Sequence, residues 1–115
     1  MKMARKRARL SVTIIVLIGF SSTIAKAGEL PAERQSALLH LLKHDCGSCH
    51  GMTLKGGLGP SLLPEDLAGK PAVALERIVS DGVPGTPMPP WKTLLSPAEV
   101  SWLVNQLLQG VTDAP

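Results

Sequence analysis

The sequence predicts a small all-α fold, and two observations indicate this. Apolar residues recur at the 3.6-residue spacing of an α-helix in three segments, at about 31–45, 71–80 and 97–109. The intervals between these segments are rich in glycine and proline, which favour turns and close backbone approach over strands. We therefore expect three main helices joined by ordered loops, with one short helical turn at residues 64–67.

The first predicted helix begins at Pro31 and ends at Asp45. Proline suits the first helical position because its fixed φ matches the helix and its missing N–H would be unpaired there anyway. Glu33 places a negative charge at the positive end of the helix. One apolar side is formed by Leu38, Leu39, Leu41 and Leu42.

The second predicted helix runs from Pro71 to Ser80 and stops at the pair Asp81-Gly82. Glycine ends a helix readily because it has no side chain to oppose the backbone turn that follows. The apolar positions of this helix are Val73, Leu75, Ile78 and Val79.

The third predicted helix has the clearest boundaries. Ser96 and Glu99 form a capping box around Pro97, which takes the first helical position. Gly110 ends the helix, because glycine readily adopts the left-handed conformation found after a helix C-terminus. The buried side is predicted to contain Val100, Leu103, Val104, Leu107 and Leu108.

Residues 1–27 have the features of a secretory signal peptide. Five basic residues precede an apolar core at residues 10–20, and Ala25-Lys26-Ala27 forms a small-x-small cleavage site. The apolar core is shorter than the roughly 20 residues that a membrane span needs. We expect cleavage after Ala27, a periplasmic domain at residues 28–115 and no stable membrane insertion. Retention of the segment as an N-terminal anchor is the alternative.

Removal of residues 1–27 reverses the net charge of the chain. The segment carries six of the twelve Lys and Arg residues and none of the nine Asp and Glu residues. Residues 28–115 therefore carry a net charge of −3, whereas the full chain carries +3. They have no basic cluster, and their only aromatic residues are Trp91 and Trp102, so we do not expect nucleic-acid binding.

The strongest functional signal is the run Cys46-Gly47-Ser48-Cys49-His50, which contains both cysteines of the chain. In an exported protein, the Cys-x-x-Cys-His spacing is the attachment signature of a c-type haem. Each thiol adds to one vinyl group of the haem, and the adjacent histidine presents an imidazole nitrogen to the iron. We therefore predict one haem c, covalently bound through Cys46 and Cys49, with His50 as an axial ligand.

Three other interpretations of this run have less support. A thioredoxin-like redox pair needs a βαβ frame, and no strand-like run lies near the cysteines. A structural zinc site needs a second pair of ligands at zinc spacing, and the chain has no third cysteine. A structural disulfide stays open, but it gives His50 no role.

A second axial ligand has to reach the iron from the opposite face of the haem. Met52 follows His50 by two residues, which is too short a reach at about 3.6 Å per residue. His40 and His44 lie on the first predicted helix, on the side of His50, and are expected to be exposed helix positions. Met88 lies in a stiff proline-rich loop, where a methionine packs poorly as core filler. We therefore predict Met88 as the second ligand, on the general pattern of His/Met cytochromes.

These motifs resemble the small single-haem class I cytochromes c. The haem-attachment run, Gly59-Pro60, Met88-Pro89 and the last helix occur in the order of that family, and the match covers residues 31–110. The resemblance implies the class I cytochrome c fold, in which loops wrap around one haem.

The resemblance also implies roles for two further residues. In the family, the carbonyl at the position of Pro60 accepts the N–H of the proximal histidine and so determines its tautomer. Trp91 resembles the family's aromatic residue near a haem propionate. Packing in the core is the alternative role for Trp91.

Within the class, residues 56–60 and 85–91 are most similar to the small 55X-class cytochromes of denitrifying bacteria, which accompany the haem-d nitrite reductase. The resemblance implies a monomeric periplasmic electron carrier, not an enzyme, with nitrite reductase as its redox partner. An assembly factor for the specialised haem of that reductase is the alternative. A sensor or enzyme with a labile Met88 ranks last, because no acid–base residue is paired with that side of the haem.

Overall fold

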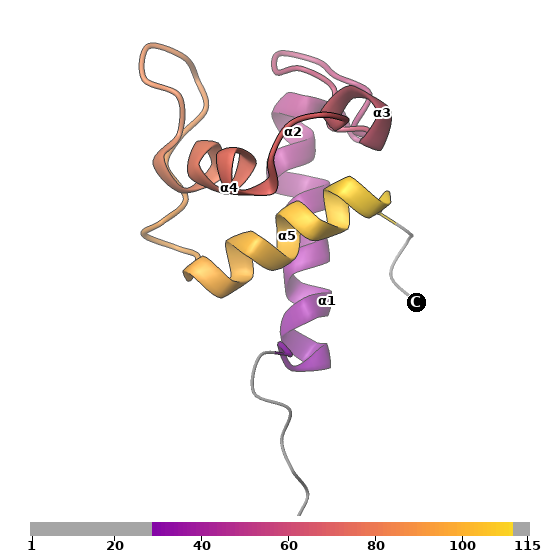
Figure 1. The fold of residues 1–115 in the computed structure, drawn as a ribbon, viewed down its shortest axis with the longest axis vertical. Helices are drawn as coiled ribbons and strands as arrows, with labels where there is room; N and C mark the ends of the chain where they lie inside the picture. Colours follow the sequence, from indigo (N-terminus) through magenta and orange to yellow (C-terminus); the bar gives the residue numbers. More distant parts are fainter. Residues whose placement is uncertain (1–28, 112–115) are drawn as a thin grey trace, which may run out of the picture.

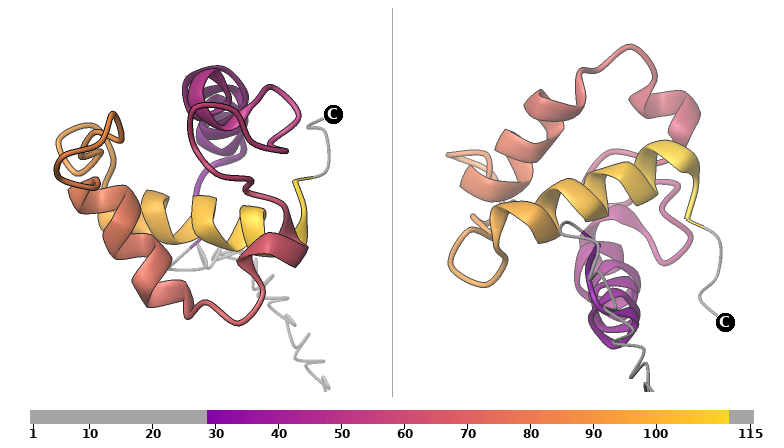
Figure 2. Two further views of the ribbon diagram at one scale, coloured as in Figure 1. Left: turned by 90° about the horizontal axis from the view of Figure 1, so that it is seen from above. Right: turned by 60° about the horizontal axis from the view of Figure 1, so that its bottom comes forward.

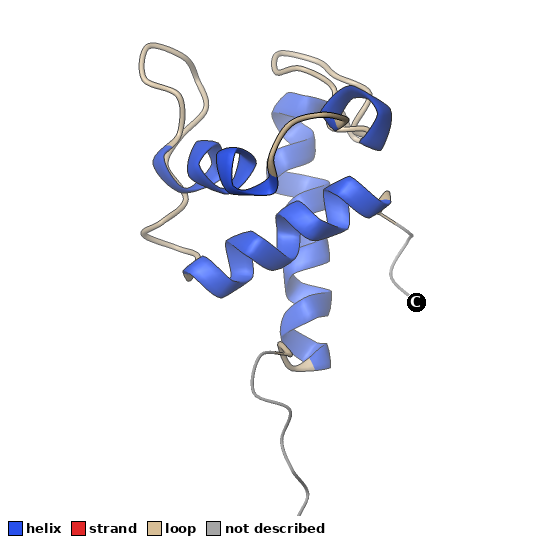
Figure 3. Cartoon of the chain, viewed as in Figure 1, coloured by secondary structure: helices blue, strands red, loops and turns tan. Residues whose placement is uncertain are grey.

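The structure is a computed structural model that describes residues 29–111; the predicted signal peptide at 1–27 lies outside the described residues. The described part is built from helices and loops without a strand, as the sequence predicts (Figure 3). In chain order its elements are α1 (Ala32–Leu41), the π-helical segment η1 (Leu42–Cys46), α2 (Gly47–His50), α3 (Pro64–Leu67), α4 (Ala72–Asp81) and α5 (Pro97–Gln109). Each of these helices is too short or too polar to traverse a bilayer.

The first helix extends further than predicted, because α1, η1 and α2 form one continuous rod (Figure 1). The N–H of Gly47 bonds to the carbonyl of Leu42, which is the i→i−5 pattern of a π-helix and carries the helix past Asp45. Gly51, with φ 89°, ends the rod after His50. The predicted end at Asp45 was therefore wrong, since the Cys-x-x-Cys-His run has no apolar periodicity that would mark it as helical.

Helix α5 is the centre of the fold. It crosses α1 at a steep angle and packs against α4 and α3 (Figures 1 and 2). The buried core is aliphatic and consists of Leu38, Leu42, Leu67, Leu95, Val100, Leu103, Val104 and Leu107. The predicted apolar side of the last helix is confirmed, with Leu108 packed at the edge of this core. That of the first helix is confirmed for Leu38, Leu41 and Leu42, whereas Leu39 lies outside the core and lines a separate depression.

The other helix boundaries follow the sequence signals. The predicted turn at residues 64–67 is confirmed as α3, and α4 begins directly after Pro71 and ends at Gly82, with φ 68°. One expectation for α4 needs correction. Val73 is 64% exposed, because it lies off the side of α4 that carries Leu75 and Val79 toward the interior.

The capping box of α5 is confirmed and is also tied to α1. The carboxylate of Glu99 accepts the N–H of Ser96 at 2.7 Å, and Ser96 Oγ accepts the N–H of Glu99 at 3.4 Å. Arg34 of α1 forms an ion pair with the same carboxylate. Arg34, together with hydrogen bonds from Ser96, lowers the pKa of Glu99 from 4.5 to about 2.

This arrangement predicts a stability difference that depends on pH. The pKa of Glu99 is lower in the folded chain than in the unfolded chain, so its ionised form stabilises the fold above pH 4.5, and this contribution is lost as the pH falls toward 2. We expect Glu99→Gln to lower the free energy of unfolding at pH 7 by about 1 kcal/mol, since solvent screens the pair with Arg34. Urea unfolding of both proteins should show this difference shrinking as the pH falls from 4.5 to 2. The exposed Glu65 is a matched control, and a Glu65→Gln profile equal to that of Glu99→Gln would contradict the assignment.

Candidate functional site

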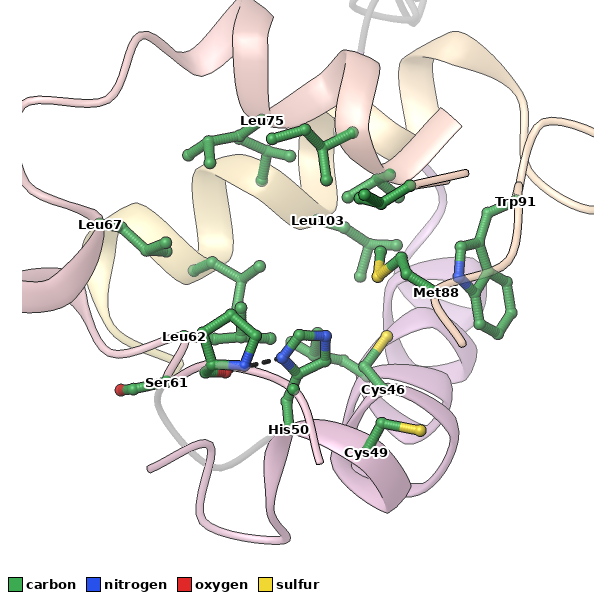
Figure 4. A pocket seen from close by; sticks show the side chains of 18 of the residues that line it. Cys46, Cys49, His50, Ser61, Leu62, Leu67, Leu75, Met88, Trp91 and Leu103 are labelled. Atoms are coloured by element: carbon green, nitrogen blue, oxygen red, sulfur yellow. Dashed lines mark hydrogen bonds between the residues drawn. The ribbon is translucent and has the colours of Figure 1, made fainter. Parts of the chain in front are cut away.

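A cavity of about 650 Å³ lies between the α1–α2 rod, the loop after it, and helices α3, α4 and α5 (Figure 4). Its volume lies in the range of about 300–1,000 Å³ that is typical of cofactor sites. The walls are mostly aliphatic and include Leu42, Leu62, Leu67, Leu75, Ile78, Val79, Leu103, Val104 and Leu107. All six predicted site residues line this one cavity: Cys46, Cys49, His50, Pro60, Met88 and Trp91.

The end of the rod brings the two thiols and the imidazole to the cavity. Cys49 and His50 follow Cys46 by three and four residues, and helical side chains at this spacing share one face. Both cysteines are free and partly buried, and His50 is 8% exposed. Burial and the neighbouring Asp45 raise the pKa of the Cys46 thiol to about 11. Reactive dithiol pairs have lowered pKa values instead, which argues against the thioredoxin-like alternative.

A single hydrogen bond determines the tautomer of the neutral His50 ring. His50 Nδ1 lies 2.7 Å from the carbonyl oxygen of Pro60 (Figure 4). A carbonyl oxygen can only accept a hydrogen bond, so Nδ1 carries a proton, and in the neutral ring Nε2 has the free lone pair. The ring therefore offers Nε2 as a ligand atom to the cavity that His50 lines.

Gly59 positions this ring, a role that the sequence analysis missed. A Cβ at Gly59 would lie 2.7 Å from Cε1 and 2.8 Å from Nδ1 of His50, so only glycine allows the ring to lie against the loop. The loop is held by the end of the rod, where Cys49 O accepts the N–H of Gly59 and His50 O accepts the N–H of Gly56, both at 2.8 Å. These bonds satisfy carbonyls that have no partner within the helix. The only sequence signal was a glycine directly before Pro60.

Met88 enters the cavity from a different wall, the loop that joins α4 to α5 (Figure 4). This loop is folded back on itself, because Met88 O accepts the N–H of Val83 at 3.2 Å and Thr86 Oγ1 accepts the N–H of Met88 at 3.3 Å. The loop is also tied to α4, since Val79 O accepts the N–H of Trp91 at 3.1 Å. Hydrogen bonds therefore add to the stiffness expected from the prolines.

Gly82 has a second role besides ending α4. A Cβ on Gly82 would lie 2.7 Å from Met88 O and 2.7 Å from the carbonyl carbon of Pro89. The backbone that carries Met88 therefore lies directly on this glycine. The sequence indicates only that Gly82 ends a helix. Its contact with the backbone of Met88 leaves no periodic pattern in the sequence.

Trp91 belongs both to the edge of the core and to the wall of the cavity. The side chain is partly buried and packs against the aliphatic core, and it also lines the cavity beside Met88 (Figure 4). The other histidines and the remaining described methionine lie elsewhere. His40, His44 and Met52 line a separate depression and are exposed, as expected for the two histidines.

The donor set fits a c-type haem. Two thiols and an imidazole nitrogen lie at one wall, a thioether sulfur enters from another wall, and aliphatic side chains line the space between them. These are the groups that hold a haem covalently and ligate its iron. A zinc cluster has no support, because the described residues contain no group of three or more His, Cys, Asp or Glu side chains that could hold a metal ion.

Comparison with known proteins agrees with this geometry. Residues 33–105 match the family described as cytochrome c oxidase, cbb3-type, subunit III. The chain is 57% identical over 79 residues to cytochrome c55X of Pseudomonas aeruginosa, a match that covers 69% of this chain and 66% of that protein. It is 47% identical over 103 residues to cytochrome c55X of Stutzerimonas stutzeri, which covers 90% of this chain and 89% of that one.

Two further matches extend the comparison. The structure of the c-type cytochrome NirC is 55% identical and superposes with a TM-score of 0.70, covering 71% of this chain and 96% of NirC. Dihydro-heme d1 dehydrogenase of Pseudomonas aeruginosa is 39% identical over 93 residues, which is 80% of this chain but 17% of that protein. With its all-α fold, its Cys46–His50 run and these relatives, the chain belongs to the cytochrome c55X family of small c-type cytochromes.

Proposed function

We propose that this cytochrome is a periplasmic electron carrier that holds one haem c covalently through Cys46 and Cys49, with His50 and Met88 as axial ligands. The observation that carries the proposal is the shared cavity, which these four side chains line from two walls. The haem, when bound, supplies a one-electron Fe(II)/Fe(III) couple. The other residues of the site hold the haem, orient its ligands or shield it from water. We assign no residue of the site as a catalytic acid or base.

Each part of the site has a separate task in this proposal. The hydrogen bond between His50 and Pro60 fixes the imidazole orientation and makes Nε2 a stronger electron-pair donor to a metal. The loop bonds around Met88 keep its thioether in place, and a methionine ligand raises the reduction potential. The aliphatic walls exclude water, and we propose that Trp91 faces a haem propionate. If His50 and Met88 both ligated the iron, no position would be open to a substrate, and the site would favour electron transfer over bond making.

We propose the haem-d nitrite reductase as the redox partner. The family assignment supports this choice, and the predicted signal peptide supports a periplasmic location. If residues 28–115 form the mature monomer, its net charge of −3 calls for a basic docking patch on the partner. Asp45, Asp66 and Lys70 line the cavity, which leaves one net negative charge beside it, so docking is proposed to occur there.

The test is electron exchange between the purified protein and nitrite reductase in a stopped-flow instrument. Intact mass should first show a chain that begins at Gly28 and carries one haem, not extractable by acidic organic solvent. The second-order rate constant should fall as salt is added, because the range of electrostatic attraction shortens to about 8 Å at physiological ionic strength.

A pair of charge variants sharpens this test. Asp45→Asn should reduce the salt dependence, since Asp45 lines the cavity. Asp81→Asn is the control, because its carboxylate is paired with Lys92 at 2.9 Å and does not line the cavity. The absence of electron exchange would contradict the proposed function, and a rate that rises with salt would contradict docking by opposite charge.

The similarity to dihydro-heme d1 dehydrogenase favours a second candidate function, an assembly factor for the specialised haem of nitrite reductase. Electron exchange with nitrite reductase supports the carrier role. Binding of the free haem precursor, without electron exchange, supports the assembly role instead.

A further inference from the structure

The rod carries a second group of potential ligands, on a depression separate from the haem cavity. His40 and His44 lie one helical turn apart, are both exposed, and have ring centroids 4.2 Å apart with planes inclined at 36°. We propose that these two imidazoles form a surface site for a copper ion, with the thioether of Met52 as an additional ligand. This site is independent of the proposed electron-carrier function.

The spacing of the two rings suits one shared ion. Two histidines at i and i+4 on one helix face are a recurrent metal-binding pair. At about 2.0–2.1 Å per metal–nitrogen bond, two imidazoles on one ion have ring centres about 4.5–5 Å apart. The observed 4.2 Å is slightly shorter than this range, so the two exposed rings have to separate and turn to share one ion.

Met52 adds a sulfur donor to the same depression, which His40, His44 and Met52 all line. The sulfur lies against the rod, since a Cβ on Gly47 would be in ordinary van der Waals contact with Met52 Sδ at 3.5 Å. Gly47 follows His44 by three residues, and residues at this spacing lie on one face of a helix. Met52 is 55% exposed, which leaves its sulfur accessible to an ion from solvent.

The donor types select the class of ion. Imidazole and thioether are ligands of copper, whereas Mg²⁺ and Ca²⁺ require oxygen ligands. Copper(II) binds a given nitrogen site more tightly than Ni²⁺ or Zn²⁺, and thioether favours Cu(I). Lys43 also lines the depression, and its positive charge opposes the binding of every cation, so the site depends on its nitrogen and sulfur donors. Leu42 lines both this depression and the haem cavity, so the two sites share one wall.

The proposal is tested with the exported, haem-loaded protein, titrated with copper sulfate in a calorimeter and followed by electron paramagnetic resonance. We expect one Cu(II) per chain with nitrogen ligation, and tighter binding of Cu(II) than of Ni²⁺ or Zn²⁺. His40→Gln or His44→Gln should weaken Cu(II) binding by at least about tenfold, because loss of a ligand exceeds the about 10- to 100-fold effect of losing an outer partner. Met52→Leu should weaken Cu(I) binding in a chelator competition and leave Cu(II) binding unchanged.

Lys43→Gln is the matched control, since it changes the same depression without removing a donor, and it should bind Cu(II) at least as tightly as the wild type. All these positions are exposed, so the haem absorption spectrum should be the same in every variant. Wild-type affinity in the His40→Gln/His44→Gln double variant would overturn the proposal. Copper binding that abolishes the methionine–iron absorption band would also overturn it, because the ion would then act in the haem cavity.

Discussion

Met88→Ala is expected to abolish the weak near-infrared absorption band of methionine–iron ligation in the oxidised protein. Alanine has no donor atom, and among the described residues the other sulfur atoms that line the cavity are the two thiols of the attachment run. The reduced protein should then bind carbon monoxide, one per haem, which the wild type should not do. Met88→His should keep the iron closed and lower the reduction potential, because imidazole stabilises Fe(III) more than a thioether does.

The second described methionine provides the control for this experiment. Met52 lines the other depression and does not line the haem cavity. Met52→Ala should therefore keep the near-infrared band, and its reduced form should not bind carbon monoxide. Retention of the band in Met88→Ala, or its loss in Met52→Ala, would contradict the assignment of Met88.

Gly59→Ala is expected to displace the His50 ring and to reduce the yield of haem-loaded protein severalfold. The new Cβ would lie 2.7 Å from Cε1 of His50, and the backbone of residue 59 is itself held by Cys49 O, so the ring has to move. Overpacking of this kind costs about 1–3 kcal/mol. Movement of the ring also breaks its 2.7 Å hydrogen bond to Pro60, which leaves the imidazole without a fixed orientation.

The measurement has to separate this positioning role from general destabilisation. Haem-methyl resonances in the NMR spectrum of the oxidised protein report the orientation of the axial imidazole and should shift in Gly59→Ala. Gly69→Ala is the matched control, because a Cβ there meets nothing within 4 Å, while φ 78° makes alanine unfavourable by about 1–2 kcal/mol. This control should lower stability and leave the haem-methyl resonances unchanged. Equal resonances in Gly59→Ala and the wild type would show that Gly59 does not position His50.

Features encoded by neighbouring residues were predictable. The capping box joins residues three apart, Pro71 and Gly82 delimit α4, and the Cys-x-x-Cys-His run is a contiguous motif. Met88 could be singled out because chain length and proline stiffness limit which sulfur can reach the far side of a haem. In each case the physical constraint acts over a short stretch of backbone, so that the order of residues alone reveals it.

Other features depend on contacts between distant segments, and only the tertiary structure decided them. The extension of the first helix to His50 is a local exception, because the backbone bond from the Gly47 N–H to Leu42 O leaves no pattern in the side chains. The ion pair between Arg34 and Glu99 joins residues 65 positions apart, and the close approach of Gly59 to His50 depends on how a loop closes. The order of residues was sufficient to predict the helices, apart from the end of the first one, as well as the attachment motif and the family. The folded structure shows which glycines contact the predicted ligand residues and which histidine rings lie close together. Such contacts depend on packing geometry and not only on spacing along the chain.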